Sequence, residues 1–310
     1  MSGARVRLAI IGSGKIACDQ HRPALDARPE FELAATVDPA GAPIGNQPHF
    51  ESFDALLASD CAFDAVAICT PPQRRYEVAR SALNKGKHVL LEKPPGATLA
   101  EVAALEASAK TMRVSLFAAW HSRFAAGVAP AKAWLAGKRI RSVTIVWRED
   151  VRVWHPGQRW IWQAGGFGVF DPGINALSIA TEILPRCLLL QQGLLQFPSN
   201  RDAPVAGLLH MEDTTGVPVT LELDFLQAGP QTWDISVETD SGRLVLKQGG
   251  SVLVLPDGTV CGADREYAGI YERFAELIAK GESEVDIAPL RLVADAFLRC
   301  RFERVDEFHE

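Results

Sequence analysis

Residues 10–17 read IIGSGKIA, and this stretch decides how the first part of the chain folds. An apolar run over residues 8–11 leads into Gly12 and Gly14, and a helix-compatible segment with the small Ala17 follows. Gly12 lets a strand turn sharply, Gly14 has no Cβ to keep a phosphate from the backbone, and Ala17 lets the helix pack close to its strand. The free N–H groups at the start of such a helix face an anion. The stretch therefore predicts a strand, a tight turn and a helix that together hold a phosphate.

A second apolar stretch, residues 31–37, ends in Asp38, about twenty residues beyond the glycines. A carboxylate there accepts hydrogen bonds from an adenosine ribose, so the combined pattern predicts a dinucleotide cofactor. Asp38 would repel a 2′-phosphate and residues 29–73 contain no Lys or Arg, which favours NAD, while Arg74 or Arg75 leaves NADP open. The residues expected to contact the cofactor are Gly12, Ser13, Gly14, Lys15, Ile16, Asp38, Thr70, Pro71, Glu92 and Lys93.

The composition is that of an ordinary globular protein, with 47% apolar and 23% charged residues. A chain of 310 residues exceeds the usual single domain, which predicts two domains. A formal net charge of −6 argues against nucleic-acid binding. No apolar run approaches the ~18 residues that a membrane span needs. The six cysteines show no Cys-x-x-Cys spacing, so we expect a cytoplasmic protein without a structural metal.

Strand-like and helix-like stretches alternate in the first third of the chain. Besides the two strands above, we expect strands at 64–70, 88–91 and 114–119 and helices at 76–85 and 98–110. The second of these helices opens with a capping-box pattern, Thr98 and Glu101. The alternation predicts an α/β fold over residues 1–122, a doubly wound parallel sheet of the Rossmann type.

From residue 123 onward the expected strands no longer alternate with helices. They lie at 143–147, 188–195, 207–211, 217–225, 233–239, 243–246 and 252–255. Helices are expected at 128–135, at 168–184, around 270–278 and from Pro289 onward. The pattern predicts an α+β domain over residues 123–310, with an open, mostly antiparallel sheet flanked by helices. Packing of the last helices against the first domain is left open.

An ionisable pair, Glu92 and Lys93, follows the expected strand 88–91 and precedes two prolines and a glycine. The carboxyl end of a parallel strand faces the crevice where such sheets bind ligands, and the prolines fix the backbone. Lys93 is thus placed to meet a substrate. The alternative is a solvated surface lysine.

Residues 165–175 read GGFGVFDPGIN. If a helix starts near Pro172, Asp171 lies at its cap or in its first turn, and Asn175 lies one turn on along the same side. The glycines let the backbone approach a ligand closely, which favours a site over the alternative of a capping Asp and a solvated Asn.

Residues 147–162 hold four tryptophans interleaved with charged residues and His155. These side chains are expected to make a poor core, because indole, imidazole and carboxylate groups all need partners. The C–H face of a pyranose lies on an aromatic ring while its hydroxyls need a few placed polar groups, so the stretch predicts a sugar-binding surface. The alternative is a protein interface. The residues expected to bind the substrate are Lys93, His121, Glu149, Asp150, Trp154, His155, Asp171 and Asn175.

Three stretches, GSGKIA, EKPPG and GGFGVFDPGIN, together resemble the Gfo/Idh/MocA oxidoreductases over nearly the whole chain. WHSRF (120–124) and EDVRVWHPGQRWIW (149–162) are more narrowly similar to the bacterial aldose 1-dehydrogenases. The resemblance implies NAD(P)-dependent oxidation of the anomeric C1 hydroxyl of an aldopyranose to the aldonolactone. L-Arabinose, D-galactose and D-fucose are the expected substrates.

The resemblance also implies roles for three residues. Lys93 matches the active-site lysine of the family and Asp171 its aspartate, while Asn175 stands where many members have histidine. We expect Asp171 to be the general base, with Lys93 stabilising the reacting oxygen and Asn175 hydrogen-bonding it. A desolvated Lys93 could exchange roles with Asp171. Pro39 stands where NADP-preferring relatives often carry arginine, which again favours NAD.

Two other hypotheses remain: an inositol or cyclic polyol dehydrogenase of the same family, and a non-catalytic regulator that binds NAD and sugar. The joint presence of Lys93, Asp171 and Asn175 argues against the regulator. A homo-oligomer, dimer or tetramer, through the open face of the second sheet is expected by analogy with the fold.

Overall fold

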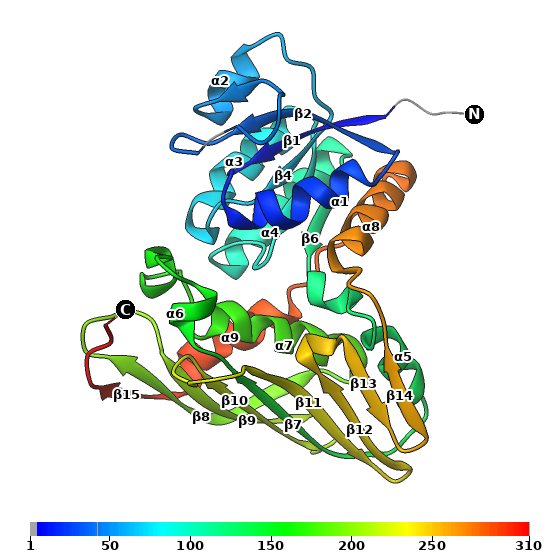
Figure 1. Ribbon diagram of the computed structural model, residues 1–310, viewed down its shortest axis with the longest axis vertical. Helices are drawn as coiled ribbons and strands as arrows, with labels where there is room; N and C mark the ends of the chain where they lie inside the picture. Colours follow the sequence, from blue (N-terminus) through cyan, green and yellow to red (C-terminus); the bar gives the residue numbers. More distant parts are fainter. Residues whose placement is uncertain (1–4, 42, 310) are drawn as a thin grey trace. The chain divides into compact units, whose positions relative to one another are not determined.

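The computed structural model describes residues 5–41 and 43–309, which form two compact units. The first takes in the chain up to His121 together with Tyr267–Asp286, and the second takes in Ser122–Glu266 and the chain from Ile287 onward. Each unit is built on its own sheet (Figure 1).

The first unit is built on the predicted Rossmann sheet. Its strands are β1 (Val6–Ile11), β2 (Phe31–Val37), β3 (His49–Phe50), β4 (Ala65–Ile68), β5 (His88–Glu92) and β6 (Leu116–Ala119). Their order is β3-β2-β1-β4-β5-β6, and every neighbouring pair is parallel. The order reverses between β1 and β4, which is the point where doubly wound sheets bind their ligands.

Helices lie on both faces of this sheet, because its strands are apolar on both sides. They are η1 (Ala17–His21), α1 (Arg22–Asp26), α2 (Phe53–Ala58), α3 (Pro72–Asn84), α4 (Leu99–Met112) and α8 (Glu266–Lys280). On one face, Ala9 and Ile11 share a core with α3 and α4. On the other, the ring of Phe31 packs against Tyr271 and Phe274 of α8.

The local helix signals are confirmed in part. The capping box forms: the Thr98 hydroxyl accepts from the Glu101 amide at 3.2 Å, and the Glu101 carboxylate accepts from the Thr98 amide. The helix expected at 76–85 begins earlier, at Pro72, because proline fits the first position of a helix. The helix after the glycines is irregular and opens with the π-helical turn η1.

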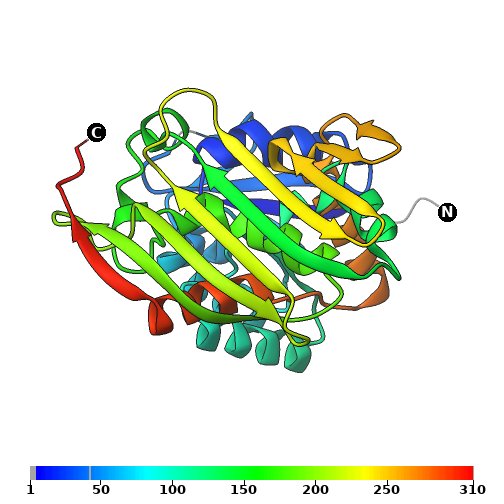
Figure 2. The same cartoon turned by 90° about the horizontal axis from the view of Figure 1, so that it is seen from below.

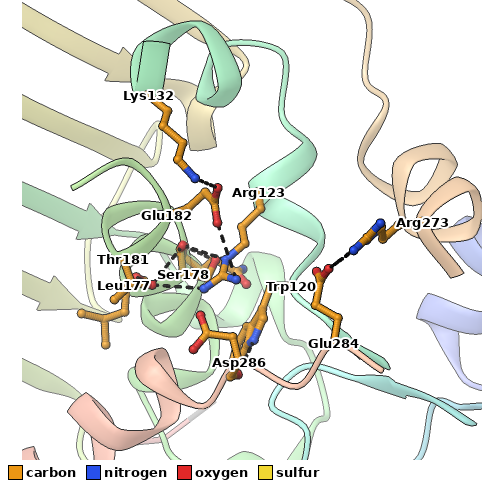
Figure 3. A network of polar contacts seen from close by, with 11 residues as sticks. Trp120, Arg123, Lys132, Leu177, Ser178, Thr181, Glu182, Arg273, Glu284 and Asp286 are labelled. Atoms are coloured by element: carbon orange, nitrogen blue, oxygen red, sulfur yellow. Dashed lines mark hydrogen bonds and ion pairs between the residues drawn. The ribbon is translucent and has the colours of Figure 1, made fainter. Parts of the chain in front are cut away.

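The segment around α8 is fastened to β6 of the same unit. The Ala118 amide donates to the Glu284 carbonyl, and the Trp120 indole donates to the Asp286 carbonyl at 2.9 Å (Figure 3). Arg273 of α8 forms an ion pair with Glu284. Of the last two helices, α8 therefore groups with the first sheet, whereas α9 (Ala288–Arg299) lies in the second unit.

The second unit is built on a nine-stranded mixed sheet. Its strands are β7 (Ile140–Arg148), β8 (Leu188–Pro198), β9 (Ala206–Asp213), β10 (Pro218–Asp224), β11 (Thr232–Thr239), β12 (Gly242–Lys247), β13 (Val252–Leu255), β14 (Gly258–Cys261) and β15 (Arg301–Val305). They follow the order β14-β13-β12-β11-β7-β10-β9-β8-β15. The mostly antiparallel prediction is confirmed, but β7 pairs with β10 and β8 with β15 in parallel. Parallel neighbours need a long crossover, and helices α7 (Phe170–Ile183) and α9 lie within these two connections.

Helices α7 and α9 pack together on one face of this sheet, and Figure 2 looks onto its other face. Shorter helical segments are η2 (His121–Phe124), α5 (Val128–Leu135), α6 (Val151–Trp154), η3 (Arg159–Trp162) and η4 (Gln248–Gly250). Exposure alternates along β9 and β10, which leaves one sheet face to solvent. In the part of the chain that the structure describes, no helix is long and apolar enough to cross a bilayer.

Candidate active site

The glycine turn after β1 has the geometry that its sequence predicts. Gly12 has a φ of +96°, and a Cβ there would lie 3.0 Å from the Thr70 amide nitrogen and 3.1 Å from the Cys69 carbonyl carbon. A side chain at this position would therefore be strained by its backbone and crowded by the end of β4. Gly14 instead faces open space, since no atom lies within 4 Å of the position of its Cβ.

Two hydroxyls beside this turn suit a bound nucleotide. Among the described residues, Ser13 Oγ and Thr70 Oγ1 are buried and have no hydrogen-bond partner in the protein. A buried polar group without a partner is costly, and a nucleotide on the turn offers phosphate and ribose oxygens to both. Lys15 forms an ion pair with Asp19, and Ile16 is exposed beside the turn. These residues fit the predicted dinucleotide.

The Asp38 carboxylate lies just beyond the end of β2, beside the glycine turn. It accepts hydrogen bonds from the backbone N–H groups of Ser13 at 2.8 Å, Ala40 at 2.9 Å and Gly41 at 2.8 Å. Burial would raise the pKa of Asp38, but these N–H groups outweigh it and lower the pKa below the ordinary value. A fixed negative charge therefore lies directly beside the glycine turn.

Of the two arginines near this end of the sheet, only Arg74 is exposed. Arg75 is buried, and its guanidinium donates to the backbone carbonyls of Thr70, Glu92 and Pro94. These hydrogen bonds hold the loop that carries Lys93 in place. The hypothesis that Arg75 meets a 2′-phosphate is therefore wrong, because its donors serve the backbone.

Glu92 is buried among protein groups, whereas its place at the end of a parallel strand predicts contact with a ligand. Its side chain is only 3% exposed, and Oε1 accepts from the Tyr267 hydroxyl at 2.6 Å and lies 3.0 Å from His21 Nε2. Oε2 accepts from the Lys93 amide at 2.8 Å. The Glu92 carboxylate thus holds the backbone of Lys93 in place, and its contact with the cofactor stays a prediction.

His21 and Glu92 form a buried charged pair. Burial would raise the pKa of Glu92, but the hydrogen bond and charge of His21 lower it well below the ordinary value. Burial would lower the pKa of His21, but Cys69, Tyr271 and Glu92 raise it well above 6.5. The imidazolium donates to Glu92 through Nε2 and to the Tyr271 hydroxyl, 2.9 Å away, through Nδ1.

We expect Glu92→Gln to lower the free energy of unfolding by about 3 kcal/mol, because it leaves a buried cation unpaired. The Glu92 contribution is present above the ordinary carboxyl pKa of 4.5 and is lost as the pH falls. The His21 contribution is complete below pH 6.5 and is lost as the pH rises through the raised pKa of the folded state. The pair therefore stabilises the fold most between these two values.

Thermal melting of wild type and Glu92→Gln across the pH range checks this expectation. The difference in melting temperature should be largest at about pH 5.5 and smaller at about pH 9. Glu106→Gln, an exposed carboxylate on α4, serves as the control. A difference that stays constant with pH would rule out a charged pair.

Lys93 lies at the end of β5 and is half-buried, between Glu92 and the buried Pro94 and Pro95. His121 follows β6, and its ring stacks on Tyr267 with centroids 5.4 Å apart. The structure thus brings His121 against Tyr267, which donates to the Glu92 carboxylate.

In the second unit, Asp171 lies in the first turn of α7 and is 4% exposed. Asn175, one turn on, is half-buried. The helix is held further along by Arg123, which donates to the Ser178 carbonyl at 3.1 Å and the Thr181 hydroxyl at 3.2 Å (Figure 3). These contacts hold the C-terminal half of α7.

His155 lies beside Asp171, and Glu149 contacts the other side of its ring. Glu149 Oε1 is 2.8 Å from His155 Nε2, and Glu149 Oε2 accepts from the Trp233 indole at 2.9 Å. His155 Nδ1 lies 3.7 Å from Asp171 Oδ2. No sequence motif connects Trp233 with this site, because it lies on β11 and only tertiary structure brings it to Glu149.

The tryptophan-rich stretch is divided between core and surface. Trp147 and Trp162 are buried, contrary to the expectation for this stretch, but among the described residues their indole N–H groups have no hydrogen-bond partner. Trp154 is 41% exposed and packs against Trp233 with centroids 4.7 Å apart. Asp150 caps the short helix α6 by accepting from the Arg152 amide at 2.9 Å. The exposed aromatic surface is therefore formed by Trp154 with Trp233.

None of the groups of His, Cys, Asp and Glu within the described ranges could hold a metal ion. All six cysteines are free thiols.

Comparison with known proteins finds relatives that match nearly the whole chain. Residues 6–119 match the family model of the Gfo/Idh/MocA oxidoreductases, described as an oxidoreductase family with an NAD-binding Rossmann fold. The chain is 43% identical over 307 residues to galactose 1-dehydrogenase of Pseudomonas fluorescens, covering 98% of this chain and 99% of the relative. A crystal structure of a D-galactose-1-dehydrogenase protein from Rhizobium etli has a TM-score of 0.95 and 51% identity, covering 100% of this chain and 99% of the other.

A more distant solved structure shares the fold alone. Myo-inositol 2-dehydrogenase from Lactobacillus plantarum has a TM-score of 0.78 at 16% identity, covering 95% of this chain and 97% of the other.

Proposed function

The chain belongs to the Gfo/Idh/MocA oxidoreductases, and from this membership we propose that it oxidises the anomeric C1 hydroxyl of D-galactose to the lactone with a nicotinamide cofactor. The proposal rests above all on the nearly full-length likeness to galactose 1-dehydrogenases in both sequence and structure. L-Arabinose and D-fucose differ from D-galactose only in the substituent at C5. One side chain could admit or exclude this substituent, so L-arabinose and D-fucose are the other aldoses that we propose as substrates.

A panel of substrates tests this proposal. Formation of the reduced cofactor, NADH or NADPH, is followed with D-galactose, L-arabinose, D-fucose and myo-inositol, each with NAD and with NADP. We expect turnover on the aldoses and none on myo-inositol. Turnover on myo-inositol alone would identify a polyol dehydrogenase, and NAD binding without any turnover would favour the regulator.

A nicotinamide cofactor held at the glycine turn of Gly12 and Gly14 would supply the acceptor for a hydride from C1 of the sugar. The C1 oxygen becomes a carbonyl only if its hydroxyl loses a proton, so a base must lie within ~3 Å of it. We assign this role to Asp171, because an ionised carboxylate accepts a proton and an amide such as that of Asn175 does not. The Lys93 ammonium stabilises the negative charge that develops on the oxygen, and the Asn175 amide hydrogen-bonds it.

We propose that the substrate surface of the second unit includes Trp154 and His155. Trp154 presents an exposed aromatic face that suits the C–H side of a pyranose. Glu149 is 1% exposed and bonded to His155 and Trp233, so it supports this surface from behind. Asp150 is the capping residue of α6, and its contact with sugar stays a prediction.

NAD is the proposed preferred cofactor, on the strength of the fixed charge of Asp38 beside the glycine turn. We expect Asp38→Ser to shift the ratio of kcat/KM for NAD over NADP towards NADP by at least tenfold, about 1.4 kcal/mol, because the repulsion of a 2′-phosphate is removed. Serine keeps an oxygen that can accept from the neighbouring N–H groups. Asp54→Ser, exposed on α2, is the control and should leave the ratio unchanged. A wild-type enzyme that prefers NADP would contradict the assignment.

We propose a homo-oligomer that uses the sheet face without helices. Leu189 of β8 and Leu208 of β9 are exposed there, and burial against a second copy would remove this apolar surface from water. The free thiols support a reducing compartment, and we propose the cytoplasm.

A further inference from the structure

The Glu149 carboxylate is a fixed acceptor for one side of the His155 imidazole. Glu149 is almost fully buried, and its two oxygens are shared between His155 Nε2 at 2.8 Å and the Trp233 indole N–H at 2.9 Å. An indole nitrogen only donates, so the carboxylate is the acceptor in both contacts. A histidine that donates to a carboxylate through Nε2 keeps its proton there, and this sets the tautomer.

The other ring nitrogen of His155 faces Asp171. With the proton on Nε2, the neutral imidazole carries its lone pair on Nδ1, which lies 3.7 Å from Asp171 Oδ2. Gln158 Oε1 lies 3.3 Å from the same nitrogen and can accept from it once Nδ1 carries a proton. Distances of this kind shorten when a substrate is bound.

The surroundings of His155 suit a group that takes up a proton for a short time. Among the described contacts, the titratable groups that face the ring are Glu149, at the end of β7, and Asp171, on α7. Phe225, after β10, contributes an apolar ring 5.7 Å away. The side chain of His155 is 15% exposed, so a proton held there can leave to solvent.

We infer that His155 is a positioning residue that receives the substrate proton from Asp171. The inference rests on the proposed dehydrogenase function. As the hydride leaves C1, the O–H bond of the C1 hydroxyl breaks and Asp171 takes the proton. Asp171 then passes this proton to His155 Nδ1, and the imidazolium that forms is stabilised by the ionised Glu149. Asp171 is thereby returned to its ionised state, and no further reactant is needed.

Two variants test the inference through the pH dependence of hydride transfer. The rate of NADH formation in a single turnover is measured with D-galactose, because product release does not mask it there. In the wild type, this rate should fall at low pH, where His155 is already protonated. His155→Gln keeps a donor for Glu149 but cannot take up a proton, so its acid limb should move to lower pH, where only protonation of the base Asp171 slows the reaction. It should also react about 10- to 100-fold more slowly.

Glu149→Gln removes the charge that favours the imidazolium, so its acid limb should move to lower pH. This second variant keeps the test decisive if His155→Gln does not fold, which thermal melting shows. His309→Gln, an exposed histidine near the C-terminus, is the matched control and should keep the wild-type profile. An acid limb that stays at the wild-type pH in Glu149→Gln, or in a folded His155→Gln, would overturn the relay.

The same experiment separates the relay from the function on which it rests. A wild-type enzyme that does not oxidise D-galactose would contradict the proposed function. An active wild type whose profile is unaltered by both substitutions would contradict the relay alone.

Discussion

Asp171→Asn is expected to lower kcat for D-galactose by about 10³-fold, within the range of about 10²–10⁴ that a positioned general base contributes. The change keeps the shape of the side chain and its place in the first turn of α7, but an amide cannot accept the C1 hydroxyl proton. NAD binding should be unchanged. The measurement is the single-turnover rate of NADH formation together with the affinity for NAD.

Asp257→Asn supplies the control for this prediction, because Asp257 is an exposed aspartate in the turn between β13 and β14. It should react at the wild-type rate. An Asp171→Asn enzyme within about threefold of wild type would remove Asp171 from the role of base. The role would then pass to Lys93, the alternative that the sequence leaves open.

Lys93→Met should lower kcat/KM for D-galactose by about 10²–10³-fold, the usual loss when one group that stabilises developing charge is removed. Methionine has a similar length without the ammonium group. The backbone of residue 93 should stay in place, because its amide is held by Glu92 and its loop by Arg75. The variant should therefore remain folded and bind NAD.

Lys85→Met is the matched control, an exposed lysine just beyond the C-terminus of α3. Steady-state kinetics and NAD titration of both variants check the prediction. Unchanged turnover in Lys93→Met would contradict the proposed site as a whole.

The Rossmann half of the fold follows from local sequence. The apolar run before Gly12, the acid after residues 31–37 and the Thr98–Glu101 capping box each act over a few residues, and the structure has the strands and the helix that they predict. Very short elements escape this kind of analysis. The strand β3 has two residues and α2 has six, too few to show a hydrophobic period.

Pairings between distant segments could not be predicted. The parallel pairs of the second sheet depend on crossovers through α7 and α9, and alternation along a single strand does not contain that information. The place of α8 is another example. Its apolar face predicts a helix, but only the tertiary structure shows that Tyr267 and Tyr271 pack around His21 and Glu92.

In the candidate site, too, some residues are indicated by local sequence and others only by tertiary structure. The sequence indicates Asp171, Glu149 and His155 as polar residues near aromatic ones, and the structure brings the three together in one unit. Trp233 lies 84 positions from Glu149, and no motif connects the two. The neighbours of Glu92 are also distant in sequence, so its support of the Lys93 backbone could not be predicted.

Transfer of the hydride from C1 is the central claim, and D-galactose labelled with deuterium at C1 tests it most directly. The labelled sugar is oxidised with NAD, and the reduced cofactor is analysed by mass spectrometry. We expect one deuterium in the reduced nicotinamide and a slower single-turnover rate than with unlabelled sugar. A reduced cofactor without deuterium, formed at the unlabelled rate, would show that oxidation occurs at another carbon and would contradict the account.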